Sequence, residues 1–353
     1  MPNIGNIKQC TIVLTRDCNL RCKFCYAKSA GYSVNERVSI DNLKKIVDFC
    51  NAANVKFIVF TGGDPLLHPD LIGILTYIKE KTPSIQVAVP TNGVLLENKD
   101  FCKQLLECGV VYFDISLKGN NSEEWIKTTG YDGYKKQQVA INNLSHMPID
   151  FTCSMVVTNK NVNDLCNMVA QAKKCGAKQF SFTFEIDNEQ RFEDGAQYLN
   201  EHNPFFLVQA FLRQMEQLNS ITDDWWIEYS YPLCVYTEEQ LKMLEGRLAS
   251  PCQIHMKDAV TFTPQMELLP CDMYIRNPIG ILGKDFNTYQ EFLEFVDSKE
   301  NYQKVMEPLR RQPSITCISC KHREACFGGC PVLWKNYSFD ELMECKKRTY
   351  QLA

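Results

Sequence analysis

Short apolar runs alternate with amphipathic stretches along the first half of the chain. Residues 39–50 show apolar side chains at helical spacing behind a capping serine, and the pattern recurs at residues 70–81, 99–108, 134–144 and 162–175. Apolar runs of strand length separate these stretches. The predicted strands are residues 9–14, 57–60, 85–89, 110–116, 150–157 and 179–186.

The regular alternation of strand and helix indicates a parallel sheet covered by helices. Polar and glycine-rich segments follow the carboxyl ends of the strands, which form the rim where barrels of this kind place their chemistry. We therefore predict an α/β fold with a partial (β/α)6 TIM-type barrel over roughly residues 7–190. A doubly wound open sheet is the alternative from the pattern alone.

The pattern changes in the second half of the chain. Residues 187–203 are acidic and polar and predict a loop, whereas residues 204–218 and 238–248 predict helices. The aromatic stretch 225–231 predicts a core strand or packing patch, with the wall of a substrate channel as the alternative. The predicted parts are a barrel over residues 1–203, a connecting segment over 204–250 and a cysteine-rich domain over 251–353.

Composition narrows the possible partners and the compartment. The 353 residues carry a net charge of −4, so no basic field favours nucleic acid or an anionic membrane. No apolar run approaches the about 20 residues of a membrane span, and no signal peptide is apparent. We therefore expect a cytoplasmic protein. In a reducing compartment, its 18 cysteines indicate metal binding rather than disulfides.

Three cysteines with the spacing C-x3-C-x2-C follow the first predicted strand: Cys18, Cys22 and Cys25. Thiolates are the usual ligands of [4Fe–4S] clusters, and three of them leave one iron open to a substrate or cofactor. Chance would produce this spacing roughly 0.05 times in a chain with this many cysteines. The loop, with Phe24 before its third cysteine, resembles the signature of the radical S-adenosylmethionine (SAM) superfamily.

The turn Gly62–Pro65 follows the second predicted strand. Its two glycines allow close backbone approach, and its aspartate could accept a hydrogen bond from a ligand ammonium, although ordinary turns have the same composition. It resembles the Gly-Gly-Glu-Pro motif that holds the amino group of SAM, with Asp64 in place of the usual glutamate. The resemblance also implies a serine at the end of the fourth strand, which Ser116 matches. Lys118, two residues later, stands where an aspartate is more usual. The expected SAM contacts are Phe24, Gly62, Gly63, Asp64, Pro65, Asn92 and Ser116.

A second cysteine pattern, C-x2-C-x5-C-x3-C, lies near the C-terminus at Cys317, Cys320, Cys326 and Cys330. Chance would produce it only about 0.002 times, so it indicates a metal site, with structural zinc as an alternative to iron. Together with flanking cysteines it resembles the SPASM module, which carries two auxiliary iron–sulfur clusters in peptide-modifying radical SAM enzymes. Met266 departs from the glycine of that pattern.

The resemblance implies which cysteines bind each auxiliary cluster. The distal cluster would be held by Cys317, Cys320, Cys326 and Cys345, and the nearer one by Cys252, Cys271 and Cys330. The fourth position of the nearer cluster is either Cys234 or an iron open to substrate. Asp272 matches an aspartate that sulfatase-maturing enzymes carry beside the equivalent cysteine, proposed to accept a proton. It is therefore a candidate base, or an acceptor that steadies the cluster loop.

The resemblance implies an enzyme with three [4Fe–4S] clusters. Such enzymes cleave SAM reductively to a 5′-deoxyadenosyl radical, which abstracts hydrogen from a peptide or protein and leads to a crosslink, thioether or similar oxidation. The implied partners are that substrate, a reductant such as flavodoxin or ferredoxin and, because the chain begins at the first strand, a separate leader-peptide recognition protein. Two alternatives remain: a radical SAM dehydrogenase or epimerase of a small molecule such as a sugar, and a zinc-stabilised binding module.

Overall fold

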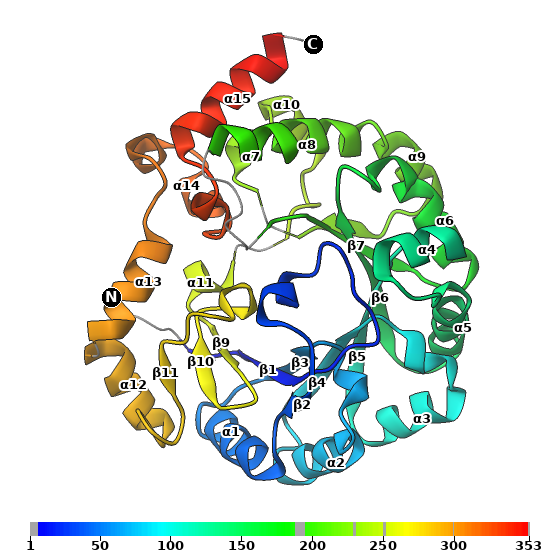
Figure 1. Cartoon of the computed structure of the whole chain (residues 1–353), viewed down its shortest axis with the longest axis vertical. Coiled ribbons are helices and arrows are strands. Elements are labelled where there is room, and N and C mark those ends of the chain that lie inside the picture. The colour runs from blue at the N-terminus through cyan, green and yellow to red at the C-terminus, as the bar shows by residue number, and fades with distance from the viewer. Residues whose placement is uncertain (1–5, 188–194, 229–230, 250–251, 299, 352–353) are drawn as a thin grey trace.

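A continuous sheet curves around the centre of the molecule (Figure 1). The computed structural model describes residues 6–187, 195–228, 231–249, 252–298 and 300–351. In those residues the sheet has 11 strands in the order β11-β10-β9-β1-β3-β4-β5-β6-β7-β8, and β2 pairs with β1 outside this path. The strands from β1 to β8 along this path are parallel.

The barrel strands follow one another in chain order, each joined to the next through covering helices. The strands are β1 (Gln9–Arg16), β3 (Phe57–Gly62), β4 (Gln86–Thr91), β5 (Val110–Ser116), β6 (Asp150–Val157), β7 (Gln179–Phe184) and β8 (Trp225–Ile227). The helices are α1 (Ile40–Ala52), α2 (Leu71–Lys81), α3 (Lys99–Glu107), α4 (Ser122–Thr129), α5 (Tyr134–Ser145), α6 (Leu165–Lys174), α8 (Pro204–Leu212) and α9 (Met215–Ile221). A doubly wound sheet would reverse its strand order, so the partial TIM-type barrel is confirmed.

The two faces of the barrel sheet differ in burial, which explains why the apolar runs are not purely apolar. On β5, Phe113 and Ile115 are fully buried. Tyr112, Asp114 and Ser116, which alternate with them along the strand, remain partly exposed. Successive side chains of a strand point to opposite faces. The interior face of the barrel is therefore partly polar and accessible.

The cysteine-rich part of the chain extends the same sheet. Strand β9 (Ala259–Phe262) lies parallel to β1, and β10 (Glu267–Leu269) and β11 (Gly280–Ile281) follow it antiparallel. The remaining helices are α10 (Glu238–Met243), α11 (Gln253–Met256), α12 (Tyr289–Ser298), α13 (Glu300–Arg310), α14 (Arg323–Cys326) and α15 (Phe339–Gln351). Strand pairing thus crosses the predicted boundary between residues 250 and 251, which lies outside the described residues. The three-part division stays a prediction.

Several elements differ from the sequence-based prediction. The predicted loop 187–203 contains a helix, α7 (Gly195–Glu201), because Tyr198 and Leu199 are buried under α15. Residues 188–194 of that loop lie outside the described part of the chain. The helix predicted over 204–218 is divided into α8 and α9, and α10 ends at Met243 because a turn with a left-handed Gly246 follows it. Strand β2 (Ser33–Arg37) and helix α4 were not predicted.

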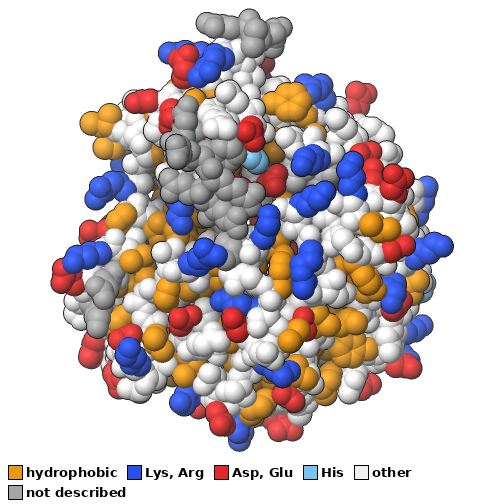
Figure 2. Space-filling model, viewed as in Figure 1, with side chains coloured by type: hydrophobic (Ala, Val, Ile, Leu, Met, Phe, Trp, Pro, Cys, Tyr) orange, Lys and Arg blue, Asp and Glu red, His pale blue; other side chains and the backbone are white. Residues whose placement is uncertain are grey.

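The aromatic stretch forms a core strand, as the simpler prediction had it. Trp225 and Ile227 of β8 are buried, while residues 229 and 230 lie outside the described residues. None of the described helices is long and apolar enough to cross a bilayer. On the face seen in Figure 2, lysine and arginine side chains are interspersed with aspartate and glutamate.

Candidate functional site

The first cysteine loop follows β1 and lies over the middle of the barrel, as the blue segment in Figure 1 shows. Cys18, Cys22 and Cys25 lie close enough that a charge on one thiolate affects the others. Burial and, to a smaller extent, the nearby Asp64 carboxylate raise the pKa of Cys18 to about 12. Burial also raises the pKa of Cys22, while the nearby Lys118 ammonium lowers it. The structure therefore brings the three predicted ligands together.

The loop is anchored by α4, an element that the sequence did not predict. The backbone N–H groups of Arg21 and Lys23 donate to carbonyl oxygens at the end of α4, over 2.8 and 3.1 Å. Leu20 packs with Trp125 of α4 in a small apolar cluster apart from the main core. Hydrogen bonds and apolar packing against α4 thus hold the segment that contains Cys18 and Cys22.

The glycines at the end of β3, Gly62 and Gly63, are required because the protein's own backbone passes close to them. A Cβ on Gly62 would lie 2.0 Å from the carbonyl oxygen of Thr15, and one on Gly63 would lie 2.0 Å from that of Asp17. Gly62 also has a φ of 142°, which disfavours other residues. The N–H of Gly63 donates to the Thr15 oxygen over 2.7 Å. These glycines let the cysteine loop dock on β3, whereas close approach of a ligand stays a prediction.

Asp64 is buried and its carboxylate is engaged within the protein. It accepts hydrogen bonds from the N–H of Leu66 at 3.0 Å, the hydroxyl of Thr91 at 2.8 Å and the N–H of Asn92 at 2.9 Å. Burial raises its pKa, and these donors oppose the rise. Pro65, directly after it, begins a short 3-10 turn. Asp64 therefore positions the end of β4, and its predicted contact with a ligand ammonium stays a prediction.

The remaining predicted SAM contacts lie around the same loop. The Asn92 side chain donates to the side chain of Asn19, between Cys18 and Leu20, over 2.8 Å. Lys118 Nζ donates to Ser116 Oγ over 2.6 Å and lies 5.0 Å from the centre of the Phe24 ring. Lys118, which departs from the family pattern, thus contacts both Ser116 and Phe24, two of the predicted SAM contacts. The sequence marked it only as a departure.

A second group of three cysteines lies in the C-terminal part. Cys252 precedes α11, Cys271 follows β10, and Cys330 lies in the segment after α14. Each is close enough to affect the charge of the other two, and burial raises the pKa of Cys330 to about 12. We refer to these three cysteines as the near group. The sequence prediction placed the nearer auxiliary cluster here.

Two buried tyrosine hydroxyls beside the near group lack hydrogen-bond partners among the described residues. They belong to Tyr274 and Tyr337, and both interact electrostatically with Cys330. Lys335 Nζ lies 3.9 Å from the centre of the Tyr274 ring. A buried hydroxyl without an acceptor is costly. The arrangement therefore fits a bound group that offers acceptors, such as the sulfides of an iron–sulfur cluster. The sequence carries no signal for either tyrosine.

Asp272 links the near group to the first loop. Burial raises the pKa of its carboxyl, which accepts a hydrogen bond from the hydroxyl of Tyr26. Tyr26 directly follows Cys25, and its hydroxyl lies 2.9 Å from Thr61 Oγ1. A proton acceptor at this position would lie between two cysteine groups. Its role as a base stays a prediction.

A third group contains Cys317, Cys320 and Cys326, which we call the distal group. Cys317 interacts electrostatically with the other two, and Cys320 is exposed. Cys234, considered above for the nearer cluster, lies beside Cys326 and Cys317 instead. Cys345 is buried in α15, where burial raises its pKa. Its place as the fourth ligand of this group stays a prediction.

No three His, Cys, Asp or Glu side chains in the described part of the chain converge as closely as a single metal ion requires. In a [4Fe–4S] cluster each thiolate binds a different iron, so its cysteine sulfurs do not meet at one point. The three cysteine groups therefore stay predicted metal sites, and their metals remain to be measured.

One polar side chain on the interior face stands out. Asp114 has one buried carboxylate oxygen without a hydrogen-bond partner among the described residues. Its pKa is raised to about 6, chiefly by burial and also by the charge of Glu228, while a hydrogen bond from Ser154 opposes the rise. The sequence did not single it out, because an aspartate inside an apolar run has no spacing signature.

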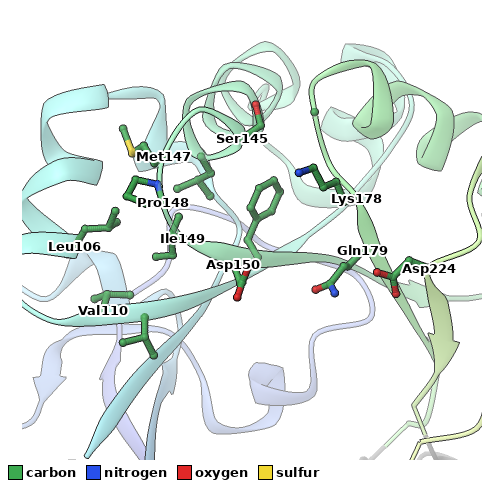
Figure 3. A pocket seen from close by; sticks show the side chains of 14 residues that line it. Leu106, Val110, Ser145, Met147, Pro148, Ile149, Asp150, Lys178, Gln179 and Asp224 are labelled. Atoms are coloured by element: carbon green, nitrogen blue, oxygen red, sulfur yellow. The ribbon is translucent and has the colours of Figure 1, made fainter.

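A separate pocket of about 670 Å³ lies at the opposite end of the barrel (Figure 3). Its lining includes Val110, Asp150 and Gln179, the first residues of β5, β6 and β7. Barrels of this kind place their chemistry at the carboxyl ends of the strands. We therefore assign this pocket no part in the site.

Comparison with known proteins identifies the barrel. Residues 12–172 match the model of the Radical SAM superfamily. This part of the chain is a radical SAM domain.

Two curated relatives show the range of proteins that share this domain. The antilisterial bacteriocin subtilosin biosynthesis protein AlbA of Bacillus subtilis is 33% identical over 180 residues, covering 50% of this chain and 39% of that protein. The GTP 3′,8-cyclase of Clostridium acetobutylicum is 30% identical over 170 residues, covering 46% of this chain and 52% of that protein. The chain thus spans about half the length of these relatives or less.

Solved structures resemble nearly the whole chain. Streptococcus suis SuiB bound to the precursor peptide SuiA has a TM-score of 0.65 at 16% identity, over 95% of this chain and 74% of that one. The protein anSMEcpe with bound AdoMet has a TM-score of 0.68 at 19% identity, over 97% of this chain and 93% of that one. At these identities the likeness establishes the fold, including its C-terminal part.

Proposed function

We propose that this chain is a radical SAM enzyme that modifies a peptide or protein oxidatively. The observation that carries the proposal is the meeting of four predicted features at one rim: the cysteine loop, the glycine turn, Asn92 and Ser116. When bound, a [4Fe–4S] cluster and SAM supply the 5′-deoxyadenosyl radical that abstracts hydrogen from an unactivated carbon.

The chain's own residues would hold and orient these groups. Cys18, Cys22 and Cys25 would bind three irons and leave the fourth to SAM. The side chain of Asn92 and the Ser116–Lys118 pair face the same loop, so they would orient the polar groups of SAM. The loop covers the middle of the barrel and would limit the access of water to the reacting carbon (Figure 1).

Three further observations support a peptide or protein substrate. The interior face of β5 is polar and partly exposed, so its side chains could contact a substrate. The near group and distal group add two predicted metal sites, and a near cluster could accept the second electron of a net oxidation. The fold neighbours include SuiB, solved with a bound precursor peptide. A reductant such as flavodoxin or ferredoxin, and a separate leader-peptide recognition protein, are part of this proposal.

A small-molecule substrate is the second candidate. GTP 3′,8-cyclases match over the same domain, and those relatives act on a nucleotide rather than a peptide. A sugar or nucleotide dehydrogenase or epimerase would use the same first loop, so the barrel alone does not separate the two substrates.

The test of radical chemistry is the formation of 5′-deoxyadenosine from SAM under anaerobic reduction. The wild-type chain should form it, and a variant with Cys18, Cys22 and Cys25 all changed to alanine should not. Cys166→Ala is the matched control, because this buried cysteine on α6 lies apart from the three groups. Formation of 5′-deoxyadenosine by the triple variant would contradict the proposal.

Metal content separates the C-terminal alternatives. Three [4Fe–4S] clusters predict about twelve irons per chain with matching sulfide. About four irons with one zinc would keep the radical chemistry but make the C-terminal part a structural clamp. Substrate class is then tested by incubation with peptides encoded beside this chain's gene and with nucleotides and sugars, using substrate-dependent 5′-deoxyadenosine as the readout.

A further inference from the structure

We propose that Asp114 positions the substrate by binding a positively charged nitrogen group, an ammonium or a guanidinium, on the interior face of the barrel. The inference rests on the proposed function, since a substrate of the radical chemistry would be held over this face. It adds the chemical class of the substrate group and the residue that receives it. Neither the cysteine groups nor their metals enter into it.

The interior face of the barrel is exposed to solvent on six neighbouring strands, β3 to β8. On each of them at least one inward residue is partly exposed, whereas the residues directly before and after it are buried. Successive side chains of a strand point to opposite faces, so the exposed residues share the face that the helices do not cover. One such residue per strand is Val59, Pro90, Asp114, Ser154, Thr183 and Trp226. A substrate group held over this face would contact these side chains.

The hydrogen bonding of Asp114 on this face is incomplete. Its Oδ1 atom is buried and has no partner among the described residues, although the Ser154 hydroxyl donates to the carboxyl group. Of the residues in register with it, Pro90 on β4 has no polar side-chain atom, and the Thr152 hydroxyl on β6 accepts a hydrogen bond from Tyr112. A buried oxygen without a donor costs the folded state free energy. A hydrogen-bond donor on the substrate would remove that cost.

The place of Asp114 along β5 suits contact with a substrate rather than with SAM. Ser116, the predicted SAM contact at the rim, lies two residues later on the same strand and on the same face. Two residues of a strand span about 7 Å, so Asp114 lies that much deeper in the barrel than the predicted SAM contact. A substrate anchored at Asp114 would therefore extend toward the rim at which the radical would form.

The groups around Asp114 favour a cation as its partner. The charge of Glu228, directly after β8, acts on Asp114 and disfavours a second negative charge there. The Trp226 indole N–H donates to Glu228 Oε1 over 2.8 Å, which holds Glu228 on the interior face. Lys118 also acts on Asp114, but its ammonium donates to Ser116 Oγ over 2.6 Å.

Carboxylates and an indole ring are the groups with which proteins bind ammonium and guanidinium ions. A cation beside Asp114 would pair its free oxygen and relieve its repulsion with Glu228, whereas a phosphate or carboxylate would add to that repulsion. The same chemistry has two sources, a lysine or arginine of a peptide and the amine of a small molecule such as an amino sugar. The experiment below separates them.

The experiment measures the binding of charged probes and their neutral counterparts to the reconstituted full chain with SAM and without reductant, by ligand-detected NMR. Two pairs represent a peptide: the Nα-acetyl N-methylamides of lysine and norleucine, and those of arginine and citrulline. Glucosamine and glucose represent a small molecule. The wild type should bind the charged member of at least one pair about tenfold more tightly, as expected for one hydrogen bond between charged groups. The pair that shows this preference identifies the source.

Three variants connect the preference to Asp114. Asp114→Asn should bind the charged and neutral probes alike, and Asp114→Glu, which restores the charge, should recover part of the preference. Glu80→Gln removes one negative charge at an exposed position of α2 and should match the wild type. Thermal unfolding of each variant shows that it is folded, so a lost preference in Asp114→Asn reflects the missing carboxylate.

Two results would overturn the assignment. One is a wild type that binds both members of every pair equally, and the other is a charge preference that survives in Asp114→Asn. Formation of 5′-deoxyadenosine by the wild type is measured separately with reductant. Its absence would contradict the proposed function whatever the probes show, whereas its presence without a charge preference would contradict only the role of Asp114.

Discussion

The first cysteine loop and the near group differ in how their polar atoms are satisfied. Around the first loop, the predicted ligand-contacting side chains are paired within the protein: Asp64 accepts from three residues, and Asn92 bonds to Asn19, although the Trp125 indole N–H behind the loop has no partner among the described residues. Around the near group, the hydroxyls of Tyr274 and Tyr337 are buried without partners among the described residues. We therefore expect the side chains of the first site to be held in place before any ligand binds, and the tyrosines of the near group to gain partners from what that group binds.

This difference has a physical consequence for stability. A buried polar group that is hydrogen-bonded costs the folded state little free energy, whereas one without a partner destabilises it by about 1–3 kcal/mol until a bound group supplies that partner. The scaffold of the first site should therefore persist without metal, while the near group should gain stability on loading. Asp114 on the barrel interior belongs with the near group in this respect, since one of its carboxylate oxygens also lacks a partner in the described part of the chain.

The largest expected effect comes from breaking the preformed scaffold. Gly63→Ala would place a Cβ 2.0 Å from the carbonyl oxygen of Asp17, so the cysteine loop could not dock on β3. We expect loss of about four irons and of essentially all 5′-deoxyadenosine formation. Iron analysis and product assay check this result.

Gly73→Ala is the matched control for that variant. Gly73 lies exposed in α2, and a Cβ there meets nothing within 4 Å. Alanine is the better helix former by about 1 kcal/mol, so this variant should keep its iron and melt slightly higher. Activity in Gly63→Ala equal to that of Gly73→Ala would show that the loop does not need its contact with β3.

The next effect separates the two sites. A variant with Cys252, Cys271 and Cys330 changed to alanine should lose about four irons and yet keep cleaving SAM without substrate, because the first scaffold does not depend on the near group. The measurement is iron content beside 5′-deoxyadenosine formation. If SAM cleavage disappeared with these irons, the two sites would be interdependent and the comparison above would fail.

The sequence predicted the first site better than the second because the first is local. Each predicted strand is an apolar run whose rim residues follow within a few positions, so the strand pattern and the family resemblance together placed Cys18, Asp64, Asn92 and Ser116 at one edge, where the structure also has them. The structure adds a role for the glycines that the sequence did not indicate: Gly62 and Gly63 accommodate the protein's own backbone.

The C-terminal part could not be assembled in the same way. The parallel pairing of β9 with β1 joins residues about 250 positions apart, and no local pattern records such a contact. Spacing identified the cysteines but not which of them lie together, so the proximity of Cys234 to Cys326 emerged only in three dimensions. The hydroxyl of Tyr274 has no sequence signature either, because only the folded structure shows that it is buried without a hydrogen-bond partner among the described residues.

An intermediate effect is expected at Asp114, through pH. Its pKa is raised to about 6 from an ordinary value of 3.8 because burial disfavours the carboxylate. The folded state therefore holds this proton more tightly than the unfolded state, and stability from this group is present below about pH 4 and lost as pH rises through about 6. Asp114→Asn removes the cost of ionisation, so it should stabilise the fold at pH 8 by up to about 3 kcal/mol and much less at pH 4.

Thermal unfolding at the two pH values measures this difference. Glu80→Gln, at an exposed position near the end of α2, controls for the loss of one negative charge. An equal shift of the melting temperature at pH 4 and pH 8, or destabilisation at pH 8, would show that the unpaired oxygen of Asp114 carries no cost.

The smallest effect should change sign with metal loading. In the metal-free protein, Tyr274→Phe removes an unpaired buried hydroxyl and should raise stability by about 1 kcal/mol. In the loaded protein the same change would remove a hydrogen bond to a cluster sulfur, so the gain should vanish. The reduction potential of that cluster should then fall by on the order of 40 mV, the equivalent of about 1 kcal/mol for one electron.

Tyr112→Phe is the control that makes this sign change decisive. The hydroxyl of Tyr112 donates to Thr152 within the protein, so its removal should destabilise the metal-free and loaded forms alike. Paired thermal unfolding of both variants, with and without reconstitution, gives four values. Only a hydroxyl that gains its acceptor from a bound group should destabilise the metal-free protein and cease to do so in the loaded protein. If Tyr274→Phe shifted both states in the same direction, the near group would be as complete without its ligand as the first loop is.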